Sequence, residues 1–265
     1  MKTIKELLNG AFDYMLELMQ LARLSGEKIN INSKAPFSYK EPSKEYKSAN
    51  DLSKAMFSFM IEESGFNKLP TVLGCNEFKN ENGMTFYHGF KKPMYAYDFL
   101  NNELYHYGNG LTEDNKYING FYLTKNKRLA SIYASKDLDK ENPQNVLSIK
   151  LENVDSIRIS EIRELLANSS CENEKYNSLF NELVEELNSL KQQTNNSRDF
   201  KMFSKSLLSN YSTIAVILGA GILIEDEKTY NKDNNEQVIV LNRGAVAVDK
   251  LEVDNILSRL DESKQ

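Results

Sequence analysis

The sequence predicts an α+β fold, in which a helical region is followed by a domain of mixed strands and helices. Three observations support this prediction. Residues 2–25 and 51–64 carry apolar side chains at helical spacing. From Thr85 onward, short runs rich in Val, Ile, Tyr and Phe are typical of half-buried strands. Residues 176–190, between two of these runs, return to an apolar repeat of three and four.

The N-terminal region, which we expect to span residues 1–64 and to pack on the rest of the chain, contains two predicted helices. The first has a single apolar stripe along its length. The second has a capping Asp near its start and Gly65 just after its end. Between the two helices, residues 28–48 are rich in Lys, Ser, Asn and Pro and predict a linker.

Residues 65–265 are predicted to form the second, larger domain. Within it, a polar break at residues 192–199 separates the helix over 176–190 from a further helix near 200–217. The strand-like runs are 85–90, 120–126, 145–151, 221–226 and 237–248.

Composition limits the classes of function. A net charge of −5 disfavours a nucleic-acid partner, because nonspecific binding to phosphates requires clustered Lys and Arg. Only two cysteines are present, so we expect no disulfide framework, no Cys-rich metal site and a reducing cytoplasm. The longest apolar run, Ile214 to Ile224, is shorter than the ~20 residues that cross a bilayer, and the N-terminus lacks the apolar block of a secretory signal. We therefore expect no membrane partner.

Three segments carry residues suited to binding or catalysis. His88 is followed by Gly89, where backbone can approach a ligand closely. Tyr122 in a strand and Tyr133 in the next helix are two rings able to enclose a flat heteroaromatic ligand. Glu236 opens a late apolar strand. Taken singly, each has a simpler interpretation: a histidine bonded to a carbonyl, two core tyrosines and a solvated hairpin residue.

Taken together and in this order, the segments resemble the His-Tyr-Glu branch of the ADP-ribosyltransferase superfamily. The wider pattern is similar to bacterial and phage ADP-ribosyltransferase-like domains, some of them attached to phage head proteins. His88 stands where the phage-head group usually has Arg, which moves the site toward the His-Tyr-Glu type. The resemblance covers roughly residues 65 to 248, and the motifs that carry it are GFNKLPTV (65–72), YHG (87–89), YGNG (107–110), GFYLT (120–124) and VLNRGAV (240–246).

The resemblance implies a split β-sheet core that binds NAD as a substrate and cleaves it at the nicotinamide bond. His88 would bind the adenosine ribose, the backbone of Gly89 the carboxamide, and Tyr122 and Tyr133 the nicotinamide ring. Glu236 would accept a hydrogen bond from the ribose 2′-hydroxyl. A carboxylate beside a sugar that becomes oxocarbenium-like stabilises charge that exists mainly in the transition state.

Several alternatives stay open from the sequence. Glu225 and Glu227 compete with Glu236 as the catalytic carboxylate, and the turn 226–235, with Tyr230, is a candidate for acceptor selection. Residues 105–119 are either a mobile lid or a plain surface loop.

The expected activity is mono-ADP-ribosylation of a macromolecule, more readily a protein than a nucleic acid, by a toxin, phage or defence effector. An NAD glycohydrolase is a close variant. A catalytically inactive binding, inhibitor or phage structural protein is the alternative from another class. Redox use of NAD and ATP hydrolysis are disfavoured, because no Gly-x-Gly-x-x-Gly follows a strand and no Walker loop is present.

Overall fold

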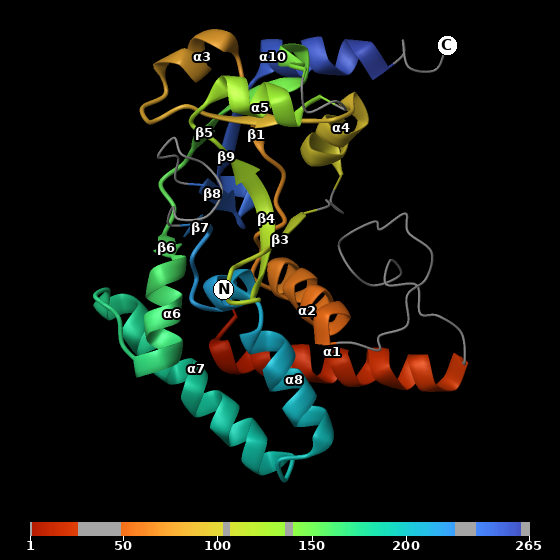
Figure 1. Cartoon of the computed structure of the whole chain (residues 1–265), viewed down its shortest axis with the longest axis vertical. Helices are drawn as coiled ribbons and strands as arrows, with labels where there is room; N and C mark the ends of the chain where they lie inside the picture. Colours follow the sequence, from red (N-terminus) through yellow and green to blue (C-terminus); the bar gives the residue numbers. More distant parts are fainter. Residues whose placement is uncertain (1, 26–48, 103–106, 136–139, 226–236, 261–265) are drawn as a thin grey trace.

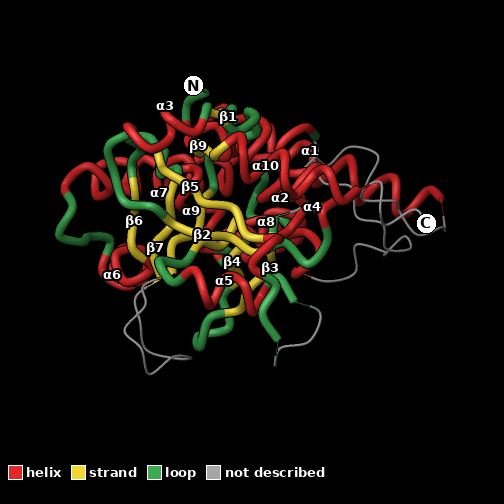
Figure 2. The backbone as a smooth tube through the Cα atoms, turned by 90° about the horizontal axis from the view of Figure 1, so that it is seen from above, coloured by secondary structure: helices red, strands yellow, loops and turns green. Residues whose placement is uncertain are grey.

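The structure, a computed structural model, describes residues 2–25, 49–102, 107–135, 140–225 and 237–260. Helices and strands are interspersed along the chain, and the strands form two mixed sheets. The predicted combination of helices and strands is therefore confirmed. The strands lie in the middle of the molecule (Figures 1 and 2), and helices cover them at both ends (Figure 1). Among the helices described, none has the length and apolar character needed to cross a membrane.

The first sheet has four strands in the order β1-β9-β5-β2, with β1 parallel to β9 and the other pairs antiparallel. The second has five in the order β3-β4-β8-β7-β6, in which only the β6–β7 pair is parallel. The strands are β1 (Thr71–Leu73), β2 (Phe86–Gly89), β3 (Gly108–Leu111), β4 (Tyr117–Leu123), β5 (Val146–Leu151), β6 (Ser156–Arg158), β7 (Ile222–Glu225), β8 (Gln237–Val240) and β9 (Val246–Asp249).

Helices at one end of the molecule share an apolar core. Helix α1 packs on α2, α7 and α8, and α2 packs on α8 and α9. The rings of Phe12 and Phe203 meet edge to face at 5.3 Å between centroids. The same buried cluster continues to both sheets through residues such as Ile239 and Val248. These helices are α1 (Ile4–Ser25), α2 (Ala49–Glu63), α7 (Glu174–Gln193), α8 (Arg198–Leu208) and α9 (Tyr211–Ile217).

Short helices cover the opposite end, where the first sheet lies (Figure 1). Helix α10 packs on α4 and on β5 and β9, and α5 packs on β2. The set comprises α3 (Cys75–Asn80), α4 (Pro93–Asn101), α5 (Lys127–Tyr133), α10 (Lys250–Leu257) and the 3-10 turns η2 (Pro143–Asn145) and η4 (Ser258–Leu260); α6 (Ile159–Asn168) follows β6 in the other half.

Most predicted helices are confirmed, and one is wrong in extent. The helices predicted over 2–25, 51–64 and 176–190 correspond to α1, α2 and α7, and Gly65 ends α2 with a φ of 75°. The single helix expected near 200–217 is instead α8 and α9, because the Asn210 side chain caps the backbone N–H of Thr213 and starts a new helix. The linker 28–48 lies outside the described residues, and the boundary between 1–64 and 65–265 stays a prediction.

The late apolar run 237–248 is two strands and not one. Strand β8 belongs to the second sheet and β9 to the first, and the 3-10 turn η3 (Arg243–Ala245) joins them. The Asn242 side chain accepts a hydrogen bond from the backbone N–H of Gly244 at 3.1 Å, which stabilises the turn. The chain thus changes sheets inside a sequence that alternation alone predicts to be continuous.

Candidate functional site

The candidate site lies where the two sheets meet. Tyr87 of β2 and Thr124, just after β4, exchange two backbone hydrogen bonds of 2.8 and 3.0 Å. This crossing brings the His88–Gly89 pair next to Tyr122, although 34 positions separate His88 from Tyr122 in the sequence. Of the residues predicted to form the site, the structure therefore joins the first two segments directly.

His88 is held by a backbone carbonyl and by two aromatic rings. Its Nδ1 lies 2.6 Å from the carbonyl oxygen of Tyr122, and its ring centroid lies 4.0 Å from that of Phe121 and 4.6 Å from that of Phe90. Burial lowers the pKa of His88 to about 4, against the hydrogen bond to Tyr122, which acts in the opposite direction. A carbonyl only accepts, so Nδ1 carries the proton of the neutral ring and Nε2 keeps its lone pair.

Gly89 permits the close packing of helix α5 on β2. A Cβ atom at this position would lie 1.9 Å from the carbonyl oxygen of Ala130 and 2.9 Å from the Cβ of Ala134, so no other residue fits without movement of the helix. Tyr133, the last residue of α5, is 48% exposed. The packing against Gly89 thus holds α5 next to the strand crossing, and α5 ends in the exposed ring of Tyr133.

Tyr122 offers a ring and not an acid or base. The side chain is half-buried, and its hydroxyl donates to the carbonyl oxygen of Ile118 at 3.1 Å. Burial, and then the negative charge of Glu225, raise the pKa of the phenol well above its usual range. The phenol is therefore neutral near pH 7, and its hydroxyl is already engaged with the protein. What remains for a ligand is the ring.

Only one of the three candidate carboxylates is described. Glu225 is the last residue of β7 and is paired in the ladder with Gln237, the first residue of β8. Glu225 is close enough to Tyr122 for its charge to act on the phenol. Glu236, Glu227 and Tyr230 lie outside the described residues. The assignment of the catalytic role to Glu236 thus stays a prediction.

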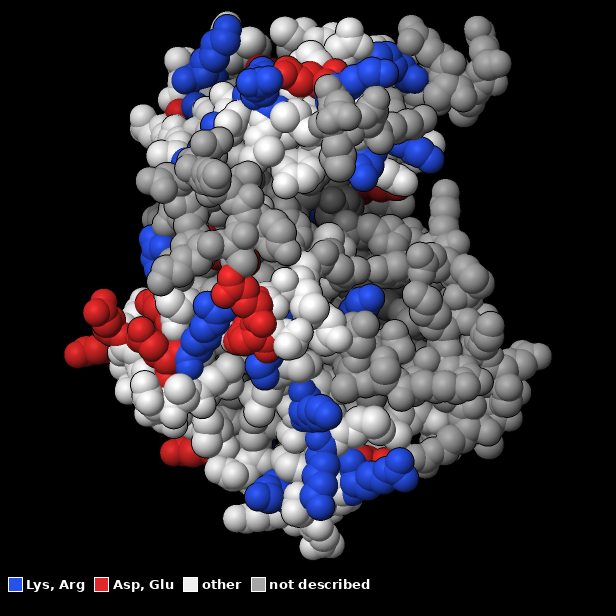
Figure 3. All heavy atoms as spheres, in the orientation of Figure 1, with Lys and Arg blue, Asp and Glu red and all other residues white. Residues whose placement is uncertain are grey.

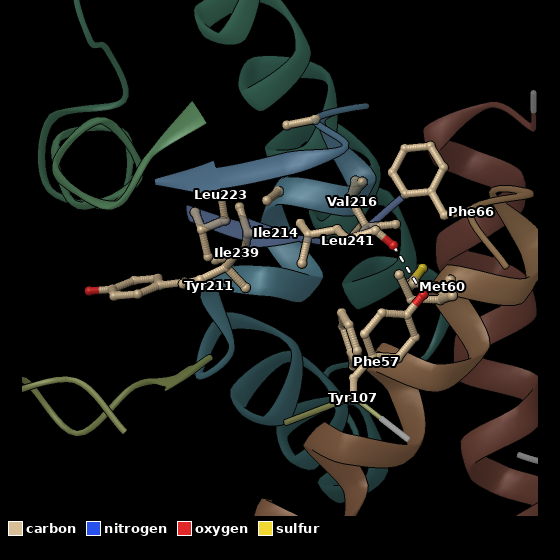
Figure 4. Close-up of a cluster of buried hydrophobic side chains, with 14 of the residues drawn as sticks. Phe57, Met60, Phe66, Tyr107, Tyr211, Ile214, Val216, Leu223, Ile239 and Leu241 are labelled. Carbon is tan, nitrogen blue, oxygen red and sulfur yellow. Dashed lines mark hydrogen bonds between the residues drawn. The ribbon is translucent and has the colours of Figure 1, made fainter. Parts of the chain in front are cut away.

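Residues 107–119 form part of a β-hairpin and not a plain surface loop, and their role as a lid stays a prediction. Strands β3 and β4 pair in register from Gly108 opposite Gly120 to Leu111 opposite Tyr117. Tyr107 is buried, and its hydroxyl donates to the carbonyl oxygen of Leu241 at 3.3 Å (Figure 4). The side chains of Tyr105 and His106 lie outside the described residues.

One buried charge, that of Arg243, lies in the motif VLNRGAV, but the sequence alone assigns this residue no role. Arg243, in the turn between β8 and β9, is fully buried. Its guanidinium donates to the carbonyl oxygens of Asn67, Asn102, Phe99 and Lys68 at 2.7, 2.8, 3.1 and 3.2 Å. These bonds join the segment before β1 to the C-terminal end of α4. An arginine inside an otherwise apolar run is the sequence signal for such a position.

Within the part of the chain that is described, no group of three or more His, Cys, Asp or Glu side chains is arranged to hold a metal ion. Comparison with known proteins adds no relative: no protein-family model, curated protein or solved structure matches the chain. The functional argument therefore depends on the geometry of the site.

Proposed function

We propose that the chain is a mono-ADP-ribosyltransferase, which cleaves NAD between nicotinamide and ribose and transfers ADP-ribose to a macromolecular acceptor. The observation that carries the proposal is the strand crossing: His88 and Gly89 lie beside Tyr122, and Gly89 also packs against the helix that carries Tyr133. A histidine, a glycine backbone and a half-buried aromatic ring at one point are the parts expected of a site for a dinucleotide such as NAD.

The electrostatic state of the residues agrees with the proposed roles. Nε2 of a neutral His88 accepts a hydrogen bond from a ribose hydroxyl, since Nδ1 is already committed to Tyr122. The ring of Tyr122 stacks on nicotinamide, and offset stacking contributes roughly 0.5–1.5 kcal/mol beyond burial. Neither residue has to transfer a proton, because nicotinamide leaves as a neutral molecule.

The activation free energy of the reaction comes mainly from the positive charge that forms on the sugar. As the bond to nicotinamide breaks, positive charge develops at C1′ and the ring oxygen, as in glycoside hydrolysis. We assign its stabilisation to Glu236, which directly precedes β8, and keep Glu225 as the competing carboxylate. A carboxylate that acts on transition-state charge raises the rate more than it raises affinity for NAD.

We propose a protein as the acceptor. On the face of the molecule in Figure 3, Lys and Arg side chains gather over α3 to α5 and again over α8, with acidic side chains around α6 and the start of α7. The chain has a net charge of −5, which disfavours a nucleic-acid backbone as the acceptor, because such a backbone binds clustered Lys and Arg.

The test is incubation of the purified chain with NAD labelled in the adenosine half, with and without bacterial lysate. Free nicotinamide and label on protein are measured together. Label on a protein band supports the transferase, whereas nicotinamide release without label on any macromolecule identifies the glycohydrolase. His88→Ala should weaken NAD binding in a folded protein. Binding of NAD without nicotinamide release, or no binding at all, would favour the inactive binding protein instead.

A further inference from the structure

The Gly-Asn-Gly segment at the start of the β3–β4 hairpin lies against the ring of Tyr122. A Cβ atom built on Gly110 would lie 2.4 Å from the Tyr122 hydroxyl oxygen, and one built on Gly108 would lie 3.0 and 3.1 Å from two ring carbons. Real Cβ contacts are essentially never shorter than 3.0 Å. The Tyr122 hydroxyl therefore occupies the space that a side chain on Gly110 would need, whereas a side chain on Gly108 would require the ring to move by a few tenths of an ångström.

Backbone conformation does not account for the glycines. Neither Gly108 nor Gly110 has a positive φ, and both are paired in the regular ladder with β4. In an extended strand, alanine is normally preferred to glycine, because glycine loses more conformational freedom on folding. The close approach of the Tyr122 hydroxyl is a physical reason for glycine at Gly110, and the tight contact with the same ring disfavours a side chain at Gly108.

The hairpin is anchored on both sides of this contact. Tyr107, just before β3, bonds to the Leu241 carbonyl. At the turn, Asp114 accepts hydrogen bonds from Tyr211, from Thr112 at 2.5 Å and from Arg163 at 3.2 Å. These hydrogen bonds outweigh the effect of burial and hold the pKa of Asp114 at about 2, so the carboxylate is charged across the physiological range. The anchors hold β3 against the ring.

We propose that Gly108 and Gly110 are positioning residues that form a floor for the Tyr122 ring and fix it as a stacking platform for nicotinamide. The inference rests on the proposed function for its ligand, but the contact itself does not. The floor fixes the ring from one side, the bond from the Tyr122 hydroxyl to the Ile118 carbonyl fixes its far end, and the ring is held before NAD arrives. Such preorganisation lowers the ordering cost of binding.

The test is a double-substitution cycle in the full chain with Gly110→Ala, Tyr122→Phe and both together. Gly110→Ala should lower the melting temperature and weaken NAD binding about tenfold, the effect of losing roughly one good ring contact. Tyr122→Phe removes the oxygen at 2.4 Å and leaves the next ring atom 3.5 Å from the new methyl group. The double variant should therefore recover the melting temperature and the NAD affinity of Tyr122→Phe alone. A merely structural glycine elsewhere in the hairpin would not be rescued by this change.

Leu111→Ala, at an exposed neighbouring position of the same strand, is the control for a general effect on the hairpin and should change neither quantity. If Gly110→Ala does not fold, a folded double variant that binds NAD still supports the floor. The proposal is overturned if Gly110→Ala matches the wild type, or if the double variant is as impaired as Gly110→Ala. Absence of NAD binding by the wild type rejects the proposed function instead, and the melting temperatures then decide the contact separately.

Discussion

The turn between β8 and β9 and the crossing of β2 and β4 each place a nitrogen-bearing side chain against main-chain carbonyls, and they do so to different extents. Around the turn between β8 and β9, fully buried Arg243 donates to four carbonyl oxygens. At the crossing of β2 and β4, half-buried His88 donates to one, that of Tyr122. A side chain whose donors are directed to the backbone holds the fold together. A half-buried side chain that bonds through only one of its two ring nitrogens can still accept a hydrogen bond from a ligand through the other.

Residues beside both regions share one buried apolar cluster with helices α1 and α2, and removing these helices is the most severe test. A chain that begins near Gly65 lacks α1 and α2, whose buried residues include Phe12, Met15, Phe57 and Met60. At about 25 cal/mol per Å² of apolar surface, their burial is comparable with the ~5–15 kcal/mol net stability of a domain. We expect this chain to be insoluble or strongly destabilised, as measured by thermal unfolding. An unchanged melting temperature with full activity would show instead that residues 1–64 are a separate module.

Arg243→Met tests the structural side of the comparison. The substitution keeps much of the volume but leaves four carbonyl oxygens without their donor, of which that of Phe99 is buried and the other three are part-buried. A buried acceptor left unsatisfied costs about 1–3 kcal/mol, and a part-buried one costs less because water can reach it. We expect urea unfolding to show a loss of about 2–4 kcal/mol. Arg128→Met is the matched control, because this side chain is 76% exposed and its ion pair with Glu141 is a surface one. An equal loss in the two variants would contradict a special role for the buried guanidinium.

Glu236→Gln tests the catalytic side. If the carboxylate stabilises transition-state charge, the amide should reduce nicotinamide release by about 10²–10³-fold and change NAD affinity only a few-fold. Stability should stay close to that of the wild type. Glu225→Gln is the competing variant, measured in the same assay. Near-normal turnover in Glu236→Gln together with loss of turnover in Glu225→Gln would move the catalytic role to the end of β7.

The long helices were predictable because apolar side chains repeated at three and four over several turns align on one face only in a helix. The α1 and α7 stripes are of this kind. Shorter features were not predictable in the same way. Strand β1 is three residues long, and the break between β8 and β9 depends on Asn242 and on partners of Arg243 far away in the sequence. Periodicity reports which face of an element is apolar, and it does not report where the chain changes sheets.

The candidate site was predictable in part, from residue types that stand out. A rare histidine before a glycine and two tyrosines near strand ends are visible in the sequence, and the structure brings His88, Gly89 and Tyr122 together. Gly108 and Gly110, which lie against Tyr122, stood out in the sequence only as part of the motif YGNG. Their role depends on a contact across the hairpin to a residue 12 positions after Gly110, and local sequence patterns predict a loop or lid for that segment.

The smallest effect that we expect is the pH dependence of stability from His88, and it separates this residue from Arg243, which stays charged. Burial lowers the pKa of folded His88 from 6.5 to about 4. Above pH 6.5 the ring is neutral in both states and contributes no dependence. As the pH falls toward 4, the unfolded chain binds a proton that the folded chain excludes, so the free energy of unfolding decreases. Because His88 is only half-buried, we expect a loss of about 1–3 kcal/mol.

His88→Asn keeps a side-chain N–H for the Tyr122 carbonyl but does not titrate, and is therefore the matched variant for this pH dependence. Carboxylates, Asp114 among them, and His106 are common to both proteins, so their contributions cancel in the difference. The free energy of unfolding is measured by urea at pH 7, 5.5 and 4.5. As the pH falls, the wild type should lose stability relative to the His88→Asn variant. A constant difference over this range would mean that the folded ring takes up its proton as readily as the unfolded one. His88 would then be solvated, and the neutral Nε2 acceptor proposed for the ribose would be lost at mildly acidic pH.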